Sequence, residues 1–196
     1  MSLTQGTDPR NRFFYKSLLE KDADVVELLA DFDADYSFIH NEGPLFYFHT
    51  NQNAPKYRVI AIDIKKPTKA EWLEIVPEGK FKLESARCVG GQIFCEYLED
   101  AKSAVHAMDL DGKLIREVTL PGLGSVGGFS GKSQDTETFY AFTGFTQPTT
   151  IYRYEIASGK STVWKQPQVA LDTSLYEAKQ IFVKSKDGTQ VPVFVV

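Results

Sequence analysis

Hydrolytic chemistry needs a nucleophile, a base and an orienting group within hydrogen-bond reach, and one segment of this chain resembles the first of these. The segment Gly128-Phe129-Ser130-Gly131-Lys132 approaches the G-x-S-x-G nucleophile elbow, in which serine lies on a strand-to-helix turn. It fails at the final position, where lysine stands in place of glycine, and no helical pattern follows. The segment therefore predicts no catalytic nucleophile.

The remaining acid–base candidates are scattered along the chain. The three histidines, His40, His49 and His106, fall in or beside predicted strands, where a lone histidine is usually structural. Three acidic positions recur at a constant interval of 46 residues: Asp63, Asp109 and Glu155. Acids that repeat once per structural unit lie on successive units and do not come together as an acid–base pair. We therefore expect them to be solvated or to bind turns. We predict no catalytic residue in this chain.

Two glycine-rich stretches imitate phosphate-binding loops. Residues 122–127 fit G-x-G-x-x-G, but a proline precedes them and a predicted strand follows, whereas a dinucleotide site needs a strand before and a helix after. Residues 127–133 are one residue short of G-x-x-x-x-G-K-S.

Cys88 and Cys95 are seven apart, so on a continuous strand they face opposite sides, and two reduced, part-buried thiols are expected. We expect no cofactor and no metal.

Composition narrows the partners and the compartment. The net charge of −4 lacks the basic footprint of a nucleic-acid-binding protein, so no nucleic acid is expected. No apolar run approaches the ~20 residues that cross a bilayer, and the N-terminus does not read as a signal peptide. No membrane partner is therefore expected. Reduced thiols fit a cytoplasmic protein.

Strand signals dominate, and they repeat. The 14 Phe and 9 Tyr favour strands, and turn signals such as Asp111-Gly112 and Ser158-Gly159 separate them. The three phased acids each lie between large apolar residues, as in Ile62-Asp63-Ile64. Around each, the order of four short strands is the same. Four strands in about 46 residues are typical of a propeller blade, for which ~40–50 residues is usual.

The predicted fold is all-β: a partial β-propeller of four-stranded antiparallel blades, about three and a half of them, with a C-terminal β-hairpin. We place the propeller in residues 1–170, with blades at about 1–19, 26–76, 81–120 and 124–165. Such a number does not close a ring, since propellers use ~4–8 blades, so the remaining blades are expected elsewhere. A β-sandwich or barrel with accidental periodicity is the rival fold.

The repeat stops after Pro167. Residues 171–196 are predicted to be a connector and then a hairpin, Gln180 to Val196, with the turn Asp187-Gly188. The second strand is apolar with little alternation, as if both its faces were covered. The chain is expected to end in the middle of a domain.

Several segments resemble the propeller of the prolyl oligopeptidase (prolyl endopeptidase) family, among them Gly6-Thr7-Asp8-Pro9-Arg10-Asn11-Arg12, Asn41-Glu42-Gly43, Ala54-Pro55-Lys56-Tyr57-Arg58-Val59-Ile60, the run Gly124 to Gly131 and Asp135-Thr136-Glu137. The segment Ser185-Lys186-Asp187-Gly188-Thr189 resembles the first hairpin of that family's C-terminal α/β-hydrolase domain. The resemblance is colinear and covers essentially the whole chain. It implies a fragment that holds the C-terminal half of the propeller and this first hairpin.

The resemblance implies a parent serine peptidase that cleaves short peptides after proline, with a seven-bladed propeller that limits access to the active site. The family's Ser, Asp and His triad belongs to the hydrolase domain, so this chain alone is expected to be inactive. Its partners would be short proline-containing peptides, the missing hydrolase domain and the remaining blades. Thr7 matches a loop position that lines an outer substrate subsite, where the family often has cysteine. The alternative for Thr7 is an ordinary loop threonine.

A second function remains open, a free-standing propeller-like module that binds protein partners through its loops. The apolar hairpin distinguishes the two, because a module complete in itself should close its last sheet. Either way, unpaired strand edges and blade faces predict self-association.

Overall fold

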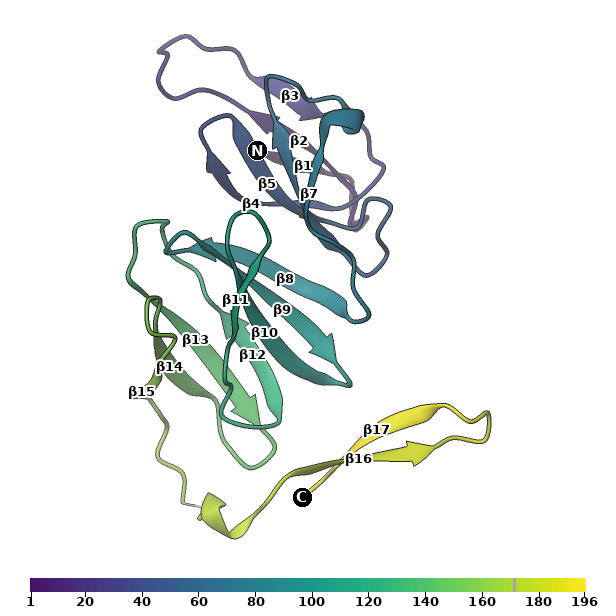
Figure 1. Cartoon of the computed structure of the whole chain (residues 1–196), viewed down its shortest axis with the longest axis vertical. Coiled ribbons are helices and arrows are strands. Elements are labelled where there is room, and N and C mark those ends of the chain that lie inside the picture. The colour runs from purple at the N-terminus through teal and green to yellow at the C-terminus, as the bar shows by residue number, and fades with distance from the viewer. Residues whose placement is uncertain (171) are drawn as a thin grey trace. The chain divides into compact units, whose positions relative to one another are not determined.

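The computed structural model describes residues 1–170 and 172–196. Leu171, which opens the predicted connector, lies outside the described residues. The chain divides into two compact units, Met1–Ala86 and Arg87–Val196. Strands are the main regular secondary structure of both units (Figure 1).

Two sheets form the first unit. The first contains three strands, in the order β1 (Ser2–Thr4), β2 (Asn11–Tyr15) and β3 (Val26–Leu29). The second contains four consecutive antiparallel strands, β4 (Tyr36–Glu42), β5 (Leu45–Thr50), β6 (Arg58–Asp63) and β7 (Leu73–Val76), with the 3-10 turn η1 (Lys69–Glu71) before β7. The two sheets contact each other through β2 and β4.

An aromatic cluster fills the space between these two sheets. Phe13 of β2 stacks on Phe38 with ring centroids 5.7 Å apart and meets Phe48 edge-on at 5.0 Å. Phe48 and Ile60 are almost completely buried. Offset and edge-to-face ring pairs add to the stabilisation from apolar burial, so this cluster holds the two sheets together.

Two further four-stranded sheets follow. One has the order β11 (Leu114–Glu117), β10 (Lys102–Met108), β9 (Gln92–Glu99) and β8 (Lys82–Val89), and the boundary between the two units falls inside β8. The other consists of β12 (Gly124–Gly128), β13 (Glu137–Gly144), β14 (Thr150–Glu155) and β15 (Ser161–Lys165). Within the second unit these sheets meet through β10 and β12.

The core between these sheets is a column of rings. Phe94, Phe129, Tyr140 and Tyr152 stack in succession, with neighbouring centroids 4.9, 4.8 and 5.2 Å apart and the rings nearly parallel. Phe129 takes part with φ +55°, an uncommon conformation for a bulky residue. The packing of its ring between the two sheets therefore offsets the cost of this backbone conformation.

These sheets confirm the predicted fold class. Each four-stranded sheet is a meander of consecutive antiparallel strands, as in a propeller blade, which is the fold class of a partial β-propeller. A register shift recurs where the third and fourth strands pair, and bulges of this kind increase strand twist. Among the described residues no helix has the length and apolar character needed to cross a membrane.

One strand belongs to a different sheet from the one we predicted. Val26–Leu29 was placed at the start of the blade at 26–76, but it pairs with β2 in the first sheet. The same register shift accompanies this pairing, between Phe13 and Phe14. The strand therefore takes the fourth-strand place of the preceding unit, and the next sheet begins at Tyr36. Residues 16–25 form a loop between β2 and β3, and this separation made the pairing of the two strands hard to predict from the sequence.

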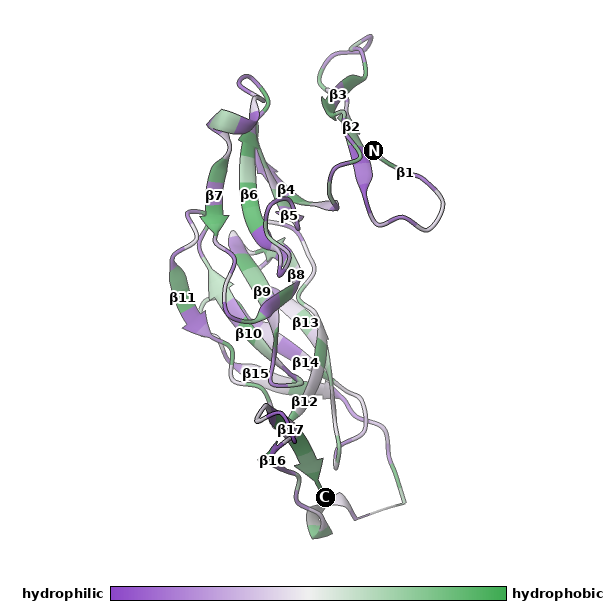
Figure 2. Ribbon diagram, turned by 90° about the vertical axis from the view of Figure 1, so that its right-hand side faces the viewer, coloured by the Kyte–Doolittle hydropathy of each residue, from purple (hydrophilic) through white to green (hydrophobic). Residues whose placement is uncertain are grey.

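The tail is a hairpin as predicted, β16 (Lys179–Lys184) and β17 (Gln190–Val195), preceded by the 3-10 turn η2 (Thr173–Leu175). Figure 2 colours most of β17 as hydrophobic. Apolar side chains of both hairpin strands are exposed: Phe182 of β16 is 51% exposed and Val191 of β17 is 42% exposed. Whether residues 171–196 belong to a separate domain stays a prediction.

Candidate functional site

Thr7 lies in the loop that joins β1 to β2. The loop turns at Gly6, whose φ of +59° is readily adopted by glycine, and the amide of Asp8 donates to the carbonyl of Gln5 at 3.2 Å. The side chain of Thr7 is exposed. It is therefore accessible to a ligand, as a subsite residue must be, although an ordinary loop threonine would be exposed too.

An ion pair within the loop fixes the residues that follow Thr7. The backbone amide, Nε and a terminal nitrogen of Arg10 donate hydrogen bonds to the Asp8 carboxylate at 3.0, 3.0 and 2.5 Å respectively. These bonds favour the carboxylate and lower the pKa of Asp8 to about 2. The Arg10 guanidinium and the Asp8 carboxylate are paired with each other. Their contact therefore stabilises the loop conformation, and neither charge is left unpaired for a ligand.

The three acids that recur every 46 residues, Asp63, Asp109 and Glu155, accept hydrogen bonds from the turns that follow them. The Asp109 carboxylate accepts hydrogen bonds from the amides of Asp111 and Lys113 at 3.0 and 2.8 Å. Asp63 accepts from the amide of Lys65 at 2.9 Å, and Glu155 accepts from the hydroxyl of Ser158. Each acid thus stabilises the turn between the third and fourth strands of its sheet. The predicted turn-bonding role is confirmed.

The histidines occupy strands, in agreement with their predicted positions. His49 of β5 is buried, with Nε2 2.9 Å from the Leu83 carbonyl and its ring stacked on Tyr57 at 4.6 Å. Burial lowers the pKa of His49. His40 of β4 pairs with Glu42 at 2.7 Å, and His106 of β10 lies against the ring of Tyr97.

The glycine-rich segment at residues 122–133 forms a strand and a closely packed loop, and no helix follows it as a phosphate-binding loop would require. Residues 124–128 are strand β12, and strand β13 follows the connecting loop. The amide of Lys132 donates to the Asp135 carboxylate at 2.7 Å, while the amide of Gly90 donates to the Lys132 carbonyl at 3.0 Å. A Cβ on Gly131 would come within 2.7 Å of Val89, so this loop must approach the neighbouring strand closely.

The two cysteines are buried thiols that are not joined in a disulfide. Burial raises the pKa of Cys95 to about 12, which keeps the group protonated and unreactive at neutral pH. Within residues 1–170 and 172–196, no group of three or more His, Cys, Asp and Glu side chains could hold a metal ion.

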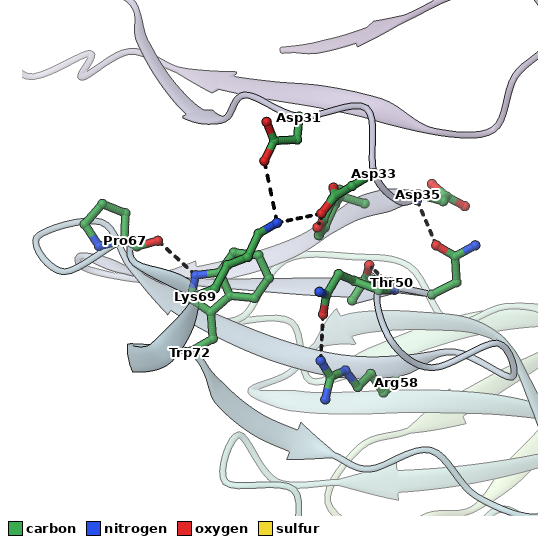
Figure 3. Close-up of polar contacts among 11 residues, drawn as sticks. Asp31, Asp33, Asp35, Thr50, Arg58, Pro67, Lys69 and Trp72 are labelled. Atoms are coloured by element: carbon green, nitrogen blue, oxygen red, sulfur yellow. Dashed lines mark hydrogen bonds and ion pairs between the residues drawn. The ribbon is translucent and has the colours of Figure 1, made fainter.

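A polar network that the sequence analysis did not identify ties the β3–β4 connection to the rest of the first unit (Figure 3). Lys69 Nζ lies 2.6 Å from Asp33 and 3.6 Å from Asp31. The Tyr36 hydroxyl donates to Asp33 at 3.0 Å, and the Asp35 amide donates to Asn51 at 2.8 Å. Lys69 thus offsets part of the negative charge of this acidic run. The alternating Asp residues at 31, 33 and 35 were the signal in the sequence.

The model of the prolyl oligopeptidase N-terminal β-propeller domain matches residues 1–167. The prolyl endopeptidase of Elizabethkingia miricola is 33% identical over 185 residues, which cover 94% of this chain and 26% of that protein. The prolyl endopeptidase of Dictyostelium discoideum is 31% identical in an alignment 198 positions long, gaps included, that covers 94% of this chain and 26% of that protein. The chain thus spans about a quarter of the length of these relatives.

Solved structures agree. A prolyl endopeptidase from a study of inter-domain dynamics in catalysis and specificity superposes with a TM-score of 0.81 at 38% identity, over 95% of this chain and 27% of that one. Prolyl oligopeptidase B of Galerina marginata, without ligand, superposes with a TM-score of 0.87 at 27% identity, over 98% of this chain and 28% of that one. The chain therefore belongs to the prolyl oligopeptidase family, through that family's N-terminal β-propeller domain.

Proposed function

We propose that this chain is the substrate-gating propeller part of a serine-type prolyl oligopeptidase that hydrolyses short peptides after proline. The observation that carries the proposal is the colinear match of residues 1–167 to the family's propeller, together with relatives that are prolyl endopeptidases. The propeller's task would be to admit small peptides and exclude folded proteins. Catalysis would come from a hydrolase domain outside these residues.

Further support comes from a structural relative. Prolyl oligopeptidase B of Galerina marginata has been solved with a 35mer hydrolysis and macrocyclization substrate bound. That protein therefore binds peptides. By analogy we propose proline-containing peptides as the ligands of the complete enzyme, with the hydrolase domain and remaining blades as structural partners.

Within this proposal, residues 1–170 are the propeller part and residues 171–196 are the connector and first hairpin of the hydrolase domain. Thr7 lines an outer substrate subsite. Its exposure, and the Asp8–Arg10 pair that fixes the adjoining loop, support this role. A cytoplasmic location is also proposed, supported by two buried cysteine thiols, and cell fractionation would test it.

The first test is the activity of the chain itself. Purified residues 1–196 should not cleave a fluorogenic peptide that contains proline, because the family's triad belongs to the hydrolase domain. Turnover that persists through purification and disappears on substitution of Ser130 would contradict the proposed inactivity. A full-length relative assayed in parallel shows that the peptide is a competent substrate.

The second test addresses Thr7 and the fit of this chain into a complete enzyme. A chimera in which this chain replaces the matching segment of the E. miricola enzyme should cleave short proline-containing peptides. In that chimera, Thr7→Tyr should raise KM for the peptide with little change in kcat, because a subsite residue affects substrate binding. Thr4→Tyr, on the neighbouring strand β1, is the matched control. Equal KM values for the two variants would remove Thr7 from the subsite.

A further inference from the structure

The loop between β13 and β14 is braced by its own hydrogen bonds. The amide of Gly144 donates to the carbonyl of Gln147 at 3.1 Å, and the hydroxyls of Thr143 and Thr149 lie 2.8 Å apart. The side-chain amide of Gln147 donates to the hydroxyl of Tyr152 at 2.7 Å. Tyr152 belongs to the stacked column of rings in the core. The loop is therefore held in one shape by the sheet from which it projects.

This braced loop presents an aromatic side chain to the tail. Phe145 stacks on Phe194 of β17, with ring centroids 4.6 Å apart and planes at 30°. A second contact joins the hairpin to the β9–β10 turn, where the side-chain amide of Gln180 donates to the Asp100 carbonyl at 2.6 Å. Asp100 and Ala101 both have positive φ, the conformation of a tight hairpin turn. Two neighbouring sheets thus each contribute one contact.

Much of the hairpin's apolar surface is exposed. Phe182, Val183 and Val191 are 51%, 48% and 42% exposed. Beside the docking loop, an open cavity of about 770 Å³ is lined by Phe145, Pro148, Val169, Tyr176 and other residues. A two-stranded hairpin alone is at best marginally stable in water, so its order depends on what it docks against.

We propose that the β13–β14 loop and the β9–β10 turn form a docking surface for the β16–β17 hairpin, with Phe145 as its main contact. Folding of the hairpin is coupled to this docking and is reversible, because one ring stack and one neutral hydrogen bond are individually weak. Only the consequence rests on the proposed function: in a complete enzyme, this contact would link the propeller to the start of the hydrolase domain.

Hydrogen exchange followed by mass spectrometry tests the docking on the full 196-residue chain. In Phe145→Leu, amides of residues 179–195 should exchange roughly 2- to 10-fold faster than in wild type, the range expected for losing one aromatic pair. Gln180→Ala should act in the same direction without altering the blade. Phe139→Leu is the matched control, since Phe139 of β13 packs edge-on against Trp164 of β15.

Exchange in β13 and β14 shows whether a variant has disturbed the blade itself. If Phe145→Leu loosens these strands, Gln180→Ala alone decides the outcome. Unchanged hairpin exchange in Gln180→Ala, or an equal acceleration in Phe139→Leu, would overturn the proposal. The measurement needs no peptidase activity, so its failure is distinct from a failure of the proposed function.

Discussion

An acidic side chain lies at the end of the third strand of each four-stranded sheet, or directly after it, and binds the turn that follows. The phase of Asp63, Asp109 and Glu155 was visible in the sequence, because like positions in successive blades recur at one interval. The bonds themselves differ: two acids accept backbone amides and Glu155 accepts a hydroxyl. Spacing therefore predicted the structural role but not the partner atoms.

Asp109 is the strongest of these anchors, because it accepts two amides of the same turn. Replacing it with alanine leaves both donors without this acceptor, and Asp109→Ala should lower the free energy of unfolding by ~1–3 kcal/mol. Urea denaturation measures the change. Asp111→Ala, an exposed position in the same turn, should stay within about 0.5 kcal/mol of wild type. Equal effects at the two positions would argue against the anchoring role.

His49 makes stability depend on pH. Burial is the main cause of its lowered pKa; Lys82 adds to the lowering, whereas the Leu83 carbonyl, Asp35 and Glu84 oppose it. A histidine with a depressed pKa binds fewer protons in the folded than in the unfolded state. Stability is therefore full above the ordinary value of 6.5 and falls as pH drops below it.

This dependence can be isolated by substitution. Urea midpoints at pH 7.5 and 5.5 should differ less in His49→Gln than in wild type, because the unequal proton uptake is gone. His40→Gln, which removes a histidine paired with Glu42, should keep the His49 contribution. A wild-type difference retained in His49→Gln would show that other groups cause it.

At the scale of elements, the sequence predicted the three four-stranded sheets correctly but placed the boundary before the first of them wrongly. Apolar and aromatic runs bounded by turn signals located strands such as β5, β9 and β14, because their apolar side chains must face a core. β3 was assigned to the wrong sheet because it is short and largely exposed, and its pairing with β2 spans a long loop. The contact between Phe145 and Phe194 left no sequence signal, since it joins a loop to a distant strand.

The Thr7 site depended on a different kind of information. Only the resemblance pointed to Thr7, because neither its residue type nor its spacing implies a ligand. The Asp8–Arg10 pair, two residues apart, was present in the sequence but became a feature of the site only once its geometry was known. Local order around the site was thus more predictable than the role of its central residue.

Strand β12 offers a matched pair of glycines for testing how closely its backbone packs. Gly128 has φ +141°, and a Cβ there would lie 2.6 Å from the Phe139 carbonyl oxygen; at Gly127 a Cβ would meet nothing within 4 Å. Gly128→Ala should therefore destabilise the protein by at least ~1–3 kcal/mol, the cost of backbone strain alone. Gly127→Ala should have a much smaller effect. Urea denaturation of both variants tests this, and similar losses would contradict the close approach.

For the whole molecule, the decisive property is how much apolar surface remains exposed. In the second unit, Phe139, Ile151 and Trp164 are 38%, 38% and 55% exposed on the sheet β12–β15. The apolar side chains of the β16–β17 hairpin are also exposed. Contiguous surface of this kind favours association between proteins, and edge strands add unpaired backbone groups.

We therefore expect the purified chain to self-associate in a concentration-dependent way, as measured by size-exclusion chromatography with light scattering. Trp164→Lys should shift the equilibrium towards the monomer, because a charge on this face must be desolvated in any contact that buries it. Lys160→Glu, in the turn between β14 and β15, controls for a general effect of altered charge. A monodisperse wild-type monomer at high concentration would mean that the exposed faces are tolerated in water, and would favour a free-standing module over a part that needs neighbours.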